Sequence, residues 1–454
     1  MNSDTSIGKI SQLLRVILLA FLAVAFSLVF WTVLRAPAIL ARDDNPRRVE
    51  SELRIQRGNI LDRTGALLAE SQPVGETFVR HYPLPAASPV VGYYNLRYGT
   101  AGIEENLDAY LRGETGSFWQ AQQRDFLHAI QTGRDVRLTL DADLQARADT
   151  LLGERNGALL LLQLGANGEA ARILALASHP GYDPNSLDEN FEALSSDEAA
   201  PLLNRVTQGQ YQPGPVLQPF ILAAALDRGI VTLDEAVDHA NRPVIVNGTA
   251  TYCASSPPAA ATWADVLAHR CPGPMQDLAE EMDAAALRAS FNGFGLTEQP
   301  ELPLNTETAV SNPISRTDLA LIGQDTLVVT PLQVAVAWAA LAEDGRLPAL
   351  QLIEDLQSDT GEWVTPQPPA EITTTAVHPE AARAVRQTLP TDNQIQAFST
   401  LVLSGPDGST NGWYLGLTPE QDPAYAVIVV LENSSALADV EGVGRGMLTA
   451  VRTP

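Results

Sequence analysis

One apolar stretch, Tyr211–Gly229, has the pattern of a turn followed by a helix that is buried on all sides: YQPGPVLQPFILAAALDRG. Pro213 and Gly214 interrupt regular structure. Pro215 suits the first position of a helix, because its missing N–H would have no partner there in any case. Apolar residues then follow on almost every side of the helix, which is typical of a helix inside a large core. We therefore predict that this helix is central and that the rest of the chain packs around it.

Two other apolar runs have the length of strands rather than helices. Gly157–Leu164 and Tyr425–Leu431 predict buried central strands, and Glu169–Ser178 predicts the hairpin partner of the first. Alternating positions in Asp135–Leu144 predict another strand, after which Asp141 can cap a helix. Further elements are expected as follows: a strand and hairpin at 55–65, helices at 105–112, 118–130, 331–343 and 379–389, an exposed loop at 355–369, and a short helix or tail at 447–454.

The run Val16–Leu34 near the start of the chain contains no charged residue. At ~1.5 Å per residue it is about long enough to cross a hydrocarbon core of ~30 Å, and Trp31 lies where interfacial aromatic residues often occur. The alternative is a cleaved signal peptide, whose cleavage site Ala36-Pro-Ala38 partly resembles, although the apolar segment of such a peptide is usually only about 7–15 residues. We predict a cytoplasmic tail at 1–12 and a transmembrane anchor at 13–35. The flanking basic residues do not decide the orientation.

The composition excludes several classes of function. The chain has 454 residues, 45% of them hydrophobic, and a formal net charge of −25, which argues against a nucleic-acid partner. It contains no glycine-rich phosphate-binding loop. The six histidines show no metal-ligand spacing, so we expect neither a metal nor a cofactor. Lys9 is the only lysine, and Cys253 and Cys271 could form a disulfide or remain two free thiols.

The segment Arg57-Gly-Asn-Ile-Leu-Asp-Arg-Thr-Gly65 begins a series of polar motifs. Its charges alone could be solvated turn residues, but their order resembles the Arg-Gly-x-Ile-x-Asp-Arg-x-Gly signature that opens the pedestal of high-molecular-weight, class B penicillin-binding proteins. Val91-Gly-Tyr93 and Gly99-Thr-Ala-Gly-Ile-Glu104 resemble later parts of that pedestal. An arginine and an aspartate at this spacing can pair across a turn. We therefore predict that Asp62 pairs with an arginine of the signature and locks the pedestal against the next domain.

The central apolar helix resembles the active-site region of the same family. In that family Pro-Gly is followed by Ser-x-x-Lys and another proline; the serine attacks the D-Ala-D-Ala carbonyl and the lysine can take the hydroxyl proton. In this chain the serine and lysine positions are Pro215 and Gln218, followed by Pro219. Proline has no side-chain heteroatom, and an amide cannot accept a proton near neutral pH. Both groups that the reaction needs are therefore missing.

The other two motifs of the family are also altered. The Ser-x-Asn motif falls on Arg270-Cys-Pro272, and the Lys-Thr/Ser-Gly motif falls on Leu403-Ser-Gly405, where the lysine is lost. Non-catalytic segments match better, for example Leu321–Gln333 and Gly412–Pro419. The degenerate motif positions are Pro215, Gln218, Arg270, Pro272, Leu403, Ser404 and Gly405.

Other side chains could restore chemistry or binding at such a site. Candidate nucleophiles without an evident base are Ser255, Ser256 and Ser311. Cys271 lies two residues from His269, and a Cys–His pair can be reactive, although a disulfide or simple burial is the alternative. Arg270 could hold the carboxylate of a stem peptide, or it could be a surface or ion-paired arginine. Ser404 could bind a substrate carboxylate or be an ordinary strand residue.

The resemblance implies a mixed α/β (α+β) penicillin-binding/transpeptidase fold, with an antiparallel sheet flanked by helices, an N-terminal β-rich pedestal and one transmembrane helix. We place the pedestal at 36–134 and the transpeptidase-like domain at 135–454. The expected function is that of a catalytically inactive scaffold or regulator of peptidoglycan synthesis, with its large domain outside the cytoplasmic membrane. The alternatives are an active D,D-transpeptidase or hydrolase with an unorthodox nucleophile, and a module that binds stem peptides. The implied partners are a membrane glycosyltransferase, an active paralogue and peptidoglycan.

Overall fold

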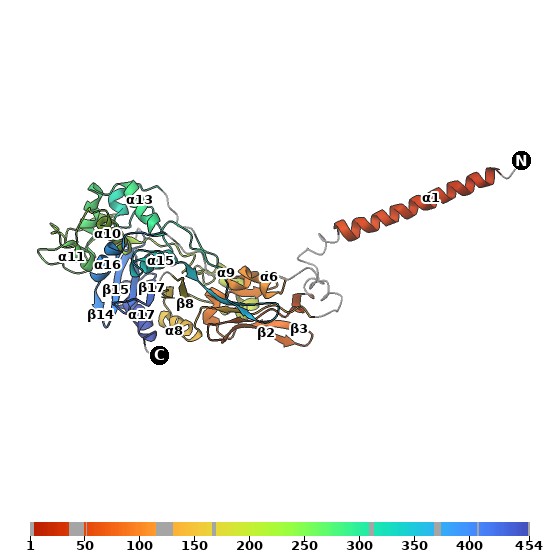
Figure 1. Ribbon diagram of the computed structural model, residues 1–454, viewed down its shortest axis with the longest axis horizontal. Coiled ribbons are helices and arrows are strands. Elements are labelled where there is room, and N and C mark those ends of the chain that lie inside the picture. The colour runs from red at the N-terminus through yellow and green to blue at the C-terminus, as the bar shows by residue number, and fades with distance from the viewer. Residues whose placement is uncertain are drawn as a thin grey trace.

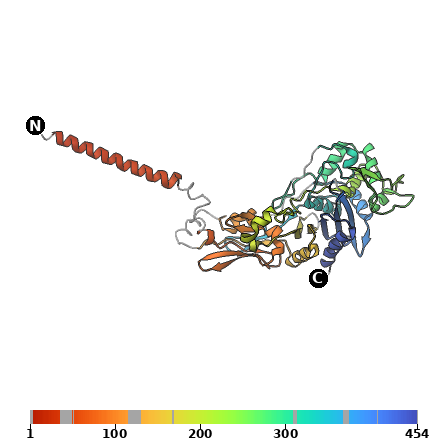
Figure 2. The same cartoon turned by 180° about the vertical axis from the view of Figure 1, so that it is seen from behind.

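A computed structural model describes residues 4–35, 50, 52–114, 130–165, 169–307, 313–366, 374–405 and 408–452. It contains a pedestal, drawn mainly in orange in Figures 1 and 2, beside a larger body that holds the main sheet. The predicted helix at 118–130 lies outside the described residues, apart from Ile130. The predicted mixed α/β architecture, an antiparallel sheet flanked by helices with a β-rich pedestal, is confirmed.

A seven-stranded sheet forms the centre of the larger body. In spatial order its strands are β11 (Leu350–Gln351), β8 (Ala171–His179), β7 (Gly157–Gln163), β17 (Tyr425–Leu431), β16 (Thr410–Thr418), β15 (Ile395–Leu403) and β14 (Thr391–Asp392). All neighbours are antiparallel except β11 and β8, which are parallel. The two apolar runs predicted as central strands, β7 and β17, lie side by side in the middle of this sheet, and β8 is the predicted hairpin partner of β7.

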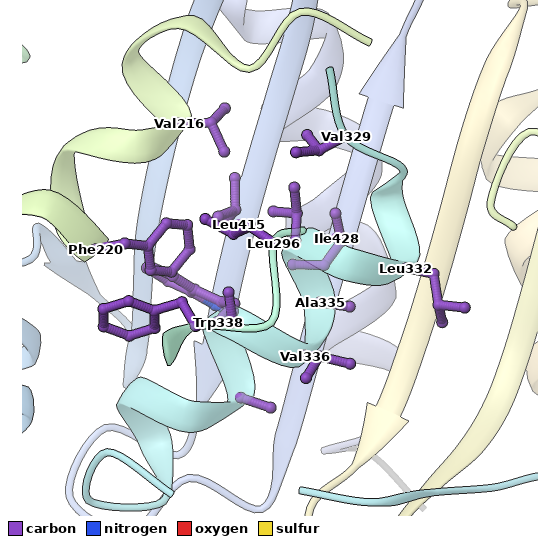
Figure 3. Packing of buried hydrophobic residues seen from close by; sticks show 14 of the residues in the cluster. Val216, Phe220, Leu296, Val329, Leu332, Ala335, Val336, Trp338, Leu415 and Ile428 are labelled. Carbon is purple, nitrogen blue, oxygen red and sulfur yellow. The ribbon is translucent and has the colours of Figure 1, made fainter. Parts of the chain in front are cut away.

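Helices cover both faces of this sheet. One face carries α10 (Gln218–Asp227), α15 (Pro331–Ala342) and α16 (Pro379–Gln387), and the other carries α8 (Ala142–Leu152) and α17 (Leu437–Ala450). The predicted central helix is confirmed, because residues 218–225 of α10 are all buried. Figure 3 shows Phe220 of α10 beside Trp338 of α15, with the two rings 6.4 Å apart and nearly perpendicular.

The C-terminal helix α17 corrects the sequence prediction, which expected only a short helix or tail at 447–454. Val440, Val443 and Met447 are buried against the sheet at helical spacing. That spacing is the signal that was missed, since the Gly-Val-Gly-Arg-Gly sequence around it is unfavourable for a helix. Gly444 is required there, because an added Cβ would lie 2.0 Å from a ring carbon of Tyr414.

The pedestal is built on a six-stranded sheet. In spatial order its strands are β13 (Trp363–Val364), β12 (Ile353–Gln357), β6 (Val136–Leu138), β1 (Ile60–Leu61), β2 (Leu67–Val74) and β3 (Thr77–His81). The predicted hairpin is confirmed, with Gly65 in the turn at φ 93°. The predicted exposed loop at 355–369 is wrong in its first part, because β12 and β13 add to this sheet. Since strands from both sides of residue 135 lie in one sheet, the division of the chain at 134/135 stays a prediction.

The remaining helices and strands are short. The predicted helix at 105–112 is instead two helices, α5 (Ile103–Asn106) and α6 (Asp108–Leu111). The other elements of the pedestal and the body are α4 (Ser88–Val91), β4 (Tyr93–Asn95), β5 (Gly99–Ala101), α9 (Leu187–Ser196), β9 (Val244–Val246), β10 (Thr249–Thr251), α11 (Trp263–His269), α12 (Pro272–Asp277), α13 (Ala284–Gly293), α14 (Thr317–Ala320) and the 3-10 turns η2 (Pro85–Ala87), η3 (Pro184–Ser186), η4 (Gly214–Leu217) and η5 (Leu278–Glu280).

Asp62 does join the pedestal to the next segment, but not through an arginine. Its carboxylate accepts hydrogen bonds from the backbone of Thr64, Ala66 and Ala142, the last at the first residue of α8. Arg57 pairs instead with Glu104 and Asp108, at 2.7 and 2.5 Å. The predicted arginine–aspartate pair across the turn is therefore wrong, because backbone N–H groups already occupy the aspartate.

The N-terminal segment forms α1 (Asp4–Val29), followed by a π-helical segment at Phe30–Arg35. Figure 1 shows α1 apart from the pedestal and the body, and its large apolar side chains from Leu13 onward are exposed. Over the described part of the chain, no helix has both the length and the apolar character needed to span a membrane. The predicted anchor at 13–35 thus remains a prediction.

Candidate active site

The turn before α10 is held tightly between β15 and the segment that follows α14. Gly214 has φ 51°, and its N–H donates to the carbonyl of Gly323 at 3.0 Å. A Cβ on Gly214 would lie 2.6 Å from a methyl carbon of Val402, so only glycine fits between these elements. Pro215 follows as the second residue of η4 and is half-buried. The structure therefore places the proline at the start of the central helix, where the predicted nucleophile position lies.

Gln218 opens α10 and is fully buried. Its Nε2 donates to the carbonyl of Cys271 at 3.4 Å, while its Oε1 has no hydrogen-bond partner among the described residues. This contact brings the first and second degenerate motifs together. At the position of the expected base, the amide of Gln218 therefore donates a hydrogen bond to the backbone of the neighbouring motif, and it has no group that can take up a proton near neutral pH.

The second degenerate motif lies between α11 and α12. Arg270 ends α11 with φ 53°, and Cys271 precedes Pro272, the first residue of α12. Cys271 forms a disulfide with Cys253, their Cα atoms 4.1 Å apart, which settles the alternative that the sequence left open. A Cys271–His269 catalytic pair is excluded in this state, because the sulfur is bonded to Cys253.

His269 has a different neighbour. Its Nδ1 lies 2.8 Å from the Oγ of Ser255, in an exposed position next to the disulfide. Sequence reasoning treated Ser255 as a nucleophile without a base, and the structure supplies one. No third side chain orients the imidazole through a hydrogen bond within the described residues, so the pair lacks the support that a catalytic triad has.

Arg270 turns toward β15. Its Nη2 donates to Ser399 Oγ at 3.4 Å, its Nη1 donates to the carbonyl of Ala268, and its guanidinium lies 5.5 Å from the ring centroid of Phe398. Ser399 in turn donates to Glu441 of α17 at 2.5 Å. Burial lowers the pKa of Arg270, and the attraction of Glu441 only partly opposes this shift. The arginine is thus neither a free surface residue nor a member of a direct ion pair.

The predicted third motif lies beyond this contact. Leu403 is the last residue of β15, and Ser404 hydrogen bonds with Ser409 at the hairpin that leads to β16. Gly405 follows in the same turn. The hydroxyl that the structure brings to Arg270 is that of Ser399. Sequence reasoning did not single out Ser399. The sequence signal for it is the pair Ser399-Thr400, which directly follows Phe398 and places two hydroxyl residues within the mostly apolar strand β15.

A buried polar cluster supports the turn from behind. Glu432 accepts hydrogen bonds from Tyr211 Oη at 2.8 Å and from Arg205 Nε at 2.9 Å. Burial raises the pKa of Tyr211, and the negative charge of Glu432 raises it further. These groups fix the backbone that leads into η4. Across the described residues, no cluster of His, Cys, Asp and Glu could hold a metal ion.

Comparison with known proteins identifies the family. Residues 166–444, more than half of the chain, match the Penicillin binding protein transpeptidase domain, and residues 57–136 match the Penicillin binding protein A dimerisation domain. The chain belongs to the class B penicillin-binding proteins. The family predicted from the motifs is therefore confirmed.

Relatives within the penicillin-binding proteins match over nearly the whole chain. The peptidoglycan D,D-transpeptidase PbpA of Mycolicibacterium smegmatis is 28% identical over 98% of this chain and 99% of that protein. Its counterpart in Mycobacterium tuberculosis is 27% identical over 92% of this chain and 93% of that protein. A structure of penicillin-binding protein A from M. tuberculosis, an imipenem acyl-enzyme complex, has a TM-score of 0.79 at 25% identity and covers 88% of this chain and 99% of that one. A penicillin G acyl-enzyme complex of the same protein has a TM-score of 0.78.

Proposed function

We propose that this chain is a membrane-anchored penicillin-binding protein of peptidoglycan synthesis that lacks transpeptidase chemistry and acts as a scaffold or regulator. The observation that carries the proposal is Pro215 at the start of the central helix. Acyl transfer through a covalent intermediate needs a nucleophilic heteroatom at that place, and proline has none. Membership of the family supports the role in cell-wall synthesis, and the loss of the nucleophile supports inactivity.

The missing base supports the same proposal. A general base needs a proton-accepting group of suitable pKa within hydrogen-bond reach of the nucleophile. Gln218 carries an amide, and its Nε2 already donates to Cys271. No lysine from elsewhere can replace it, because Lys9 is the only one in the chain and precedes the proposed membrane anchor.

The burial of residues along the unpaired side of β15 also favours a scaffold over a peptide-binding module. On one side β15 pairs with β16 from Gln396 to Leu403. On its other side short β14 pairs only with Ile395 and Gln396, so the rest of that side has no strand partner among the described residues. A peptide that adds to a sheet needs an exposed edge. Ser399 and Thr400 are nevertheless only 2% and 3% exposed, with Arg270 lying against Ser399. The guanidinium donates to Ser399 and Ala268, and its Nε, which has no partner among the described residues, is buried, so it is poorly placed to hold a stem-peptide carboxylate.

The location and partners follow from the family and from α1. We infer that residues 13–35 anchor the chain in the cytoplasmic membrane with the large domain outside, because this segment has an uncharged core and exposed apolar side chains. The pedestal at 36–134 and the domain at 135–454 then stand on the outer side. Partners of the expected kind are a membrane glycosyltransferase or an active paralogue. Crosslinking in cells followed by mass spectrometry identifies them, and recovery of no cell-wall synthesis protein would contradict the scaffold role.

Penicillin labelling tests the proposed inactivity. The full chain in detergent is incubated with penicillin G, and its intact mass is compared with that of M. tuberculosis penicillin-binding protein A, for which a penicillin G acyl-enzyme is known. We expect the mycobacterial protein to gain one penicilloyl group and this chain to gain none. A stoichiometric adduct on this chain would overturn the proposal.

A hydrolase with an unorthodox nucleophile is the second candidate, and the contact between Ser255 and His269 favours it. A serine hydroxyl within hydrogen-bond reach of an imidazole can be activated by it. Any adduct found in the labelling experiment is therefore mapped by peptide sequencing and repeated with Ser255→Ala. Loss of the adduct in that variant would establish the second candidate in place of the first.

A further inference from the structure

The hairpin of β9 and β10 has a face whose large apolar side chains are exposed. Ile245 of β9 is 62% exposed, and Tyr252, directly after β10, is 63% exposed. Ile245 pairs with Ala250, and because alternate residues of a strand point to the same side, Tyr252 shares their face. Val244 and Val246 point to the other side and are buried in the core. Exposed apolar side chains that gather on one face are typical of an interaction surface.

The chain around this face carries no charge. Residues 243–264 include no Asp, Glu, Lys, Arg or His, although the chain as a whole has a formal net charge of −25. A net charge of this size makes two copies of the chain repel each other. The repulsion is weakest where the copies meet through uncharged surfaces, whereas a basic partner would find no carboxylate there to pair with. The hairpin therefore fits a second copy better than a basic partner.

The outer edge of β10 is available for strand pairing. Asn247 and Gly248 form the two-residue turn of the hairpin, and their φ angles of 51° and 83° fit a type I′ turn. In such a hairpin the residues that flank the turn, Val246 and Thr249, form a hydrogen-bonded pair, so the N–H and C=O of Ala250 point away from β9. No backbone hydrogen bond joins β10 to any described residue outside the hairpin.

The two edges of the hairpin differ in how they are protected. Proteins commonly protect an edge strand with charged residues or with proline. On the β9 side, Pro243 lacks an N–H at a position where an added strand would need one. On the β10 side, the run Thr249-Ala-Thr-Tyr252 contains neither a charge nor a proline. An added strand can therefore pair with β10 but not with β9.

We propose that a second copy of this chain occupies this edge, with β10 paired to β10 in antiparallel orientation. The pairing is self-complementary about a two-fold axis at Ala250, where each N–H donates to the C=O of Ala250 of the second copy. Thr249 then faces Thr251 of the second copy, which is a favourable cross-strand pair.

The same register covers the exposed apolar side chains. Tyr252 lies opposite Gly248 of the second copy, where no atom comes within 4 Å of an added Cβ, so the ring has room to pack there. Ile245 and Ala250 of both copies form one apolar row across the four strands. The pairing thus explains why two large apolar side chains and an unprotected edge occur together on one hairpin.

This surface is separate from the pedestal and from the degenerate motif at Pro215. The disulfide of Cys253 and the bond from the Ala254 N–H to the carbonyl of His269 tie the hairpin to α11. Figure 1 shows α11 at the end of the body far from the pedestal. The proposal therefore differs from an association through the pedestal, and it does not depend on whether Pro215 abolishes catalysis.

Sedimentation equilibrium of the full chain in detergent micelles measures the association over a range of protein concentrations. We expect a reversible equilibrium between monomer and dimer. Ala250→Pro removes the N–H that each copy donates to the other, so Kd should rise about tenfold or more. The melting temperature should not change, because this N–H points away from β9. Ala250→Val keeps the donor and should not raise Kd.

A pair of charge variants separates this surface from the pedestal. Tyr252→Glu replaces the ring that packs on the second copy by a carboxylate, so Kd should rise. Val79→Glu is the matched control, because Val79 is 51% exposed on the pedestal, and it should leave Kd unchanged. A dimer that is lost in Val79→Glu but kept in Tyr252→Glu would place the contact on the pedestal and contradict the proposal.

Cross-linking locates the contact independently of these variants. Ala250→Cys places two thiols face to face at the two-fold axis, where the Cα atoms of a hydrogen-bonded pair lie about 5.5 Å apart, a distance that a disulfide can bridge. Mild oxidation should link this variant into dimers much faster than Val79→Cys. Absence of a dimer at all concentrations, an unchanged Kd in Ala250→Pro, or equal rates of cross-linking in the two cysteine variants would overturn the proposal.

Discussion

Asp62 shows how a single buried carboxylate can join two parts of a chain. It is 1% exposed, and Thr64 Oγ1 donates to it in addition to three backbone N–H groups. Burial alone would raise the pKa of Asp62, but the hydrogen bonds from Ala142, Thr64 and Ala66 together lower it. One oxygen closes the hairpin of the pedestal and the other holds the first turn of α8, so the same residue fixes both elements.

Replacing Asp62 by Ala should therefore lower the free energy of unfolding by about 1–3 kcal/mol, because buried donors lose their acceptor. Chemical denaturation of the full chain in detergent measures the change. Asp143→Ala on the exposed face of α8 is the control, and we expect it to change the stability by less than about 0.5 kcal/mol. Equal stability of the Asp62→Ala variant and the wild type would show that the hydrogen bonds contribute nothing net.

Glu104 provides the corresponding prediction for pH. It is fully buried and lies between Arg57 and Arg80, at 2.7 and 2.5 Å. Burial opposes its ionisation, but the two arginines outweigh burial and lower its pKa. A carboxylate with a lowered folded-state pKa stabilises the fold above its unfolded pKa of about 4.3, and this stabilisation is lost as the pH falls through the folded-state value.

Glu104→Gln should cost about 3–5 kcal/mol at neutral pH, since it leaves the buried side chain of Arg80 without its counter-charge and leaves Arg57 with Asp108 alone. The difference between wild type and variant should then shrink as the pH is lowered below about 4. Denaturation curves over this pH range test both statements, with exposed Glu105→Gln as the control. A difference that stays constant down to acidic pH would mean that Glu104 is not ionised in the folded protein.

At the scale of whole elements, the sequence predicted those whose pattern is local. The apolar runs of β7 and β17 and the all-round apolar helix α10 could each be recognised within their own residues. The strand β12 could not, because its five residues are all half-buried and its local partner β13 is only two residues long. Its longer pairing is with β6, more than 200 positions earlier. Its polar, proline-flanked sequence favours a loop until that partner is known.

In the candidate site, too, features that depend on local sequence could be predicted, and contacts between distant segments could not. The proposed loss of the nucleophile and the base at Pro215 and Gln218 could be inferred from the spacing of the family motif alone. The contact of Arg270 with Ser399 was not, because it depends on how the loop after α11 crosses the edge of β15. Ser404 fitted the family spacing, yet the hairpin beyond β15 places it next to Ser409 instead. Side-chain partners that are distant in the sequence are set by packing, which local patterns do not encode.

The start of α10 provides a prediction at this scale. Restoring only the first motif, with Pro215→Ser and Gln218→Lys, should give slow acylation by penicillin or none. The serine would regain a possible base, but Arg270 and Pro272 would still occupy the second motif, and Leu403 cannot supply the lysine of the third. Intact-mass spectrometry over the time in which the mycobacterial protein is fully acylated measures the result, and the two single variants serve as controls. Rapid stoichiometric acylation would show that the first motif alone had been lost.

For the whole molecule, contacts distributed over the joint hold the pedestal against the body. The backbone N–H of Tyr82 donates to the side chain of Asn185, and the amide of Asn204 donates to Pro89. These two bonds connect segments from both matched family regions. The bond from the Ala142 N–H to Asp62 joins the pedestal to the first residue of α8. A rigid pedestal of this kind suits a protein that presents a fixed surface to partners at a set distance from the membrane, which is the role we propose.

That role requires the folded part to lie outside the cytoplasmic membrane, and the N-terminal segment makes this testable. Because Val16–Leu34 carries no charge, we expect residues 13–35 to hold the chain in the membrane fraction after a wash with high salt, and a variant that lacks residues 1–35 to become soluble. Protease added to intact protoplasts should then digest the pedestal and the body, while a cytoplasmic marker protein survives. Digestion only after lysis would place the large domain inside, and the proposed function at the cell wall would have to be abandoned.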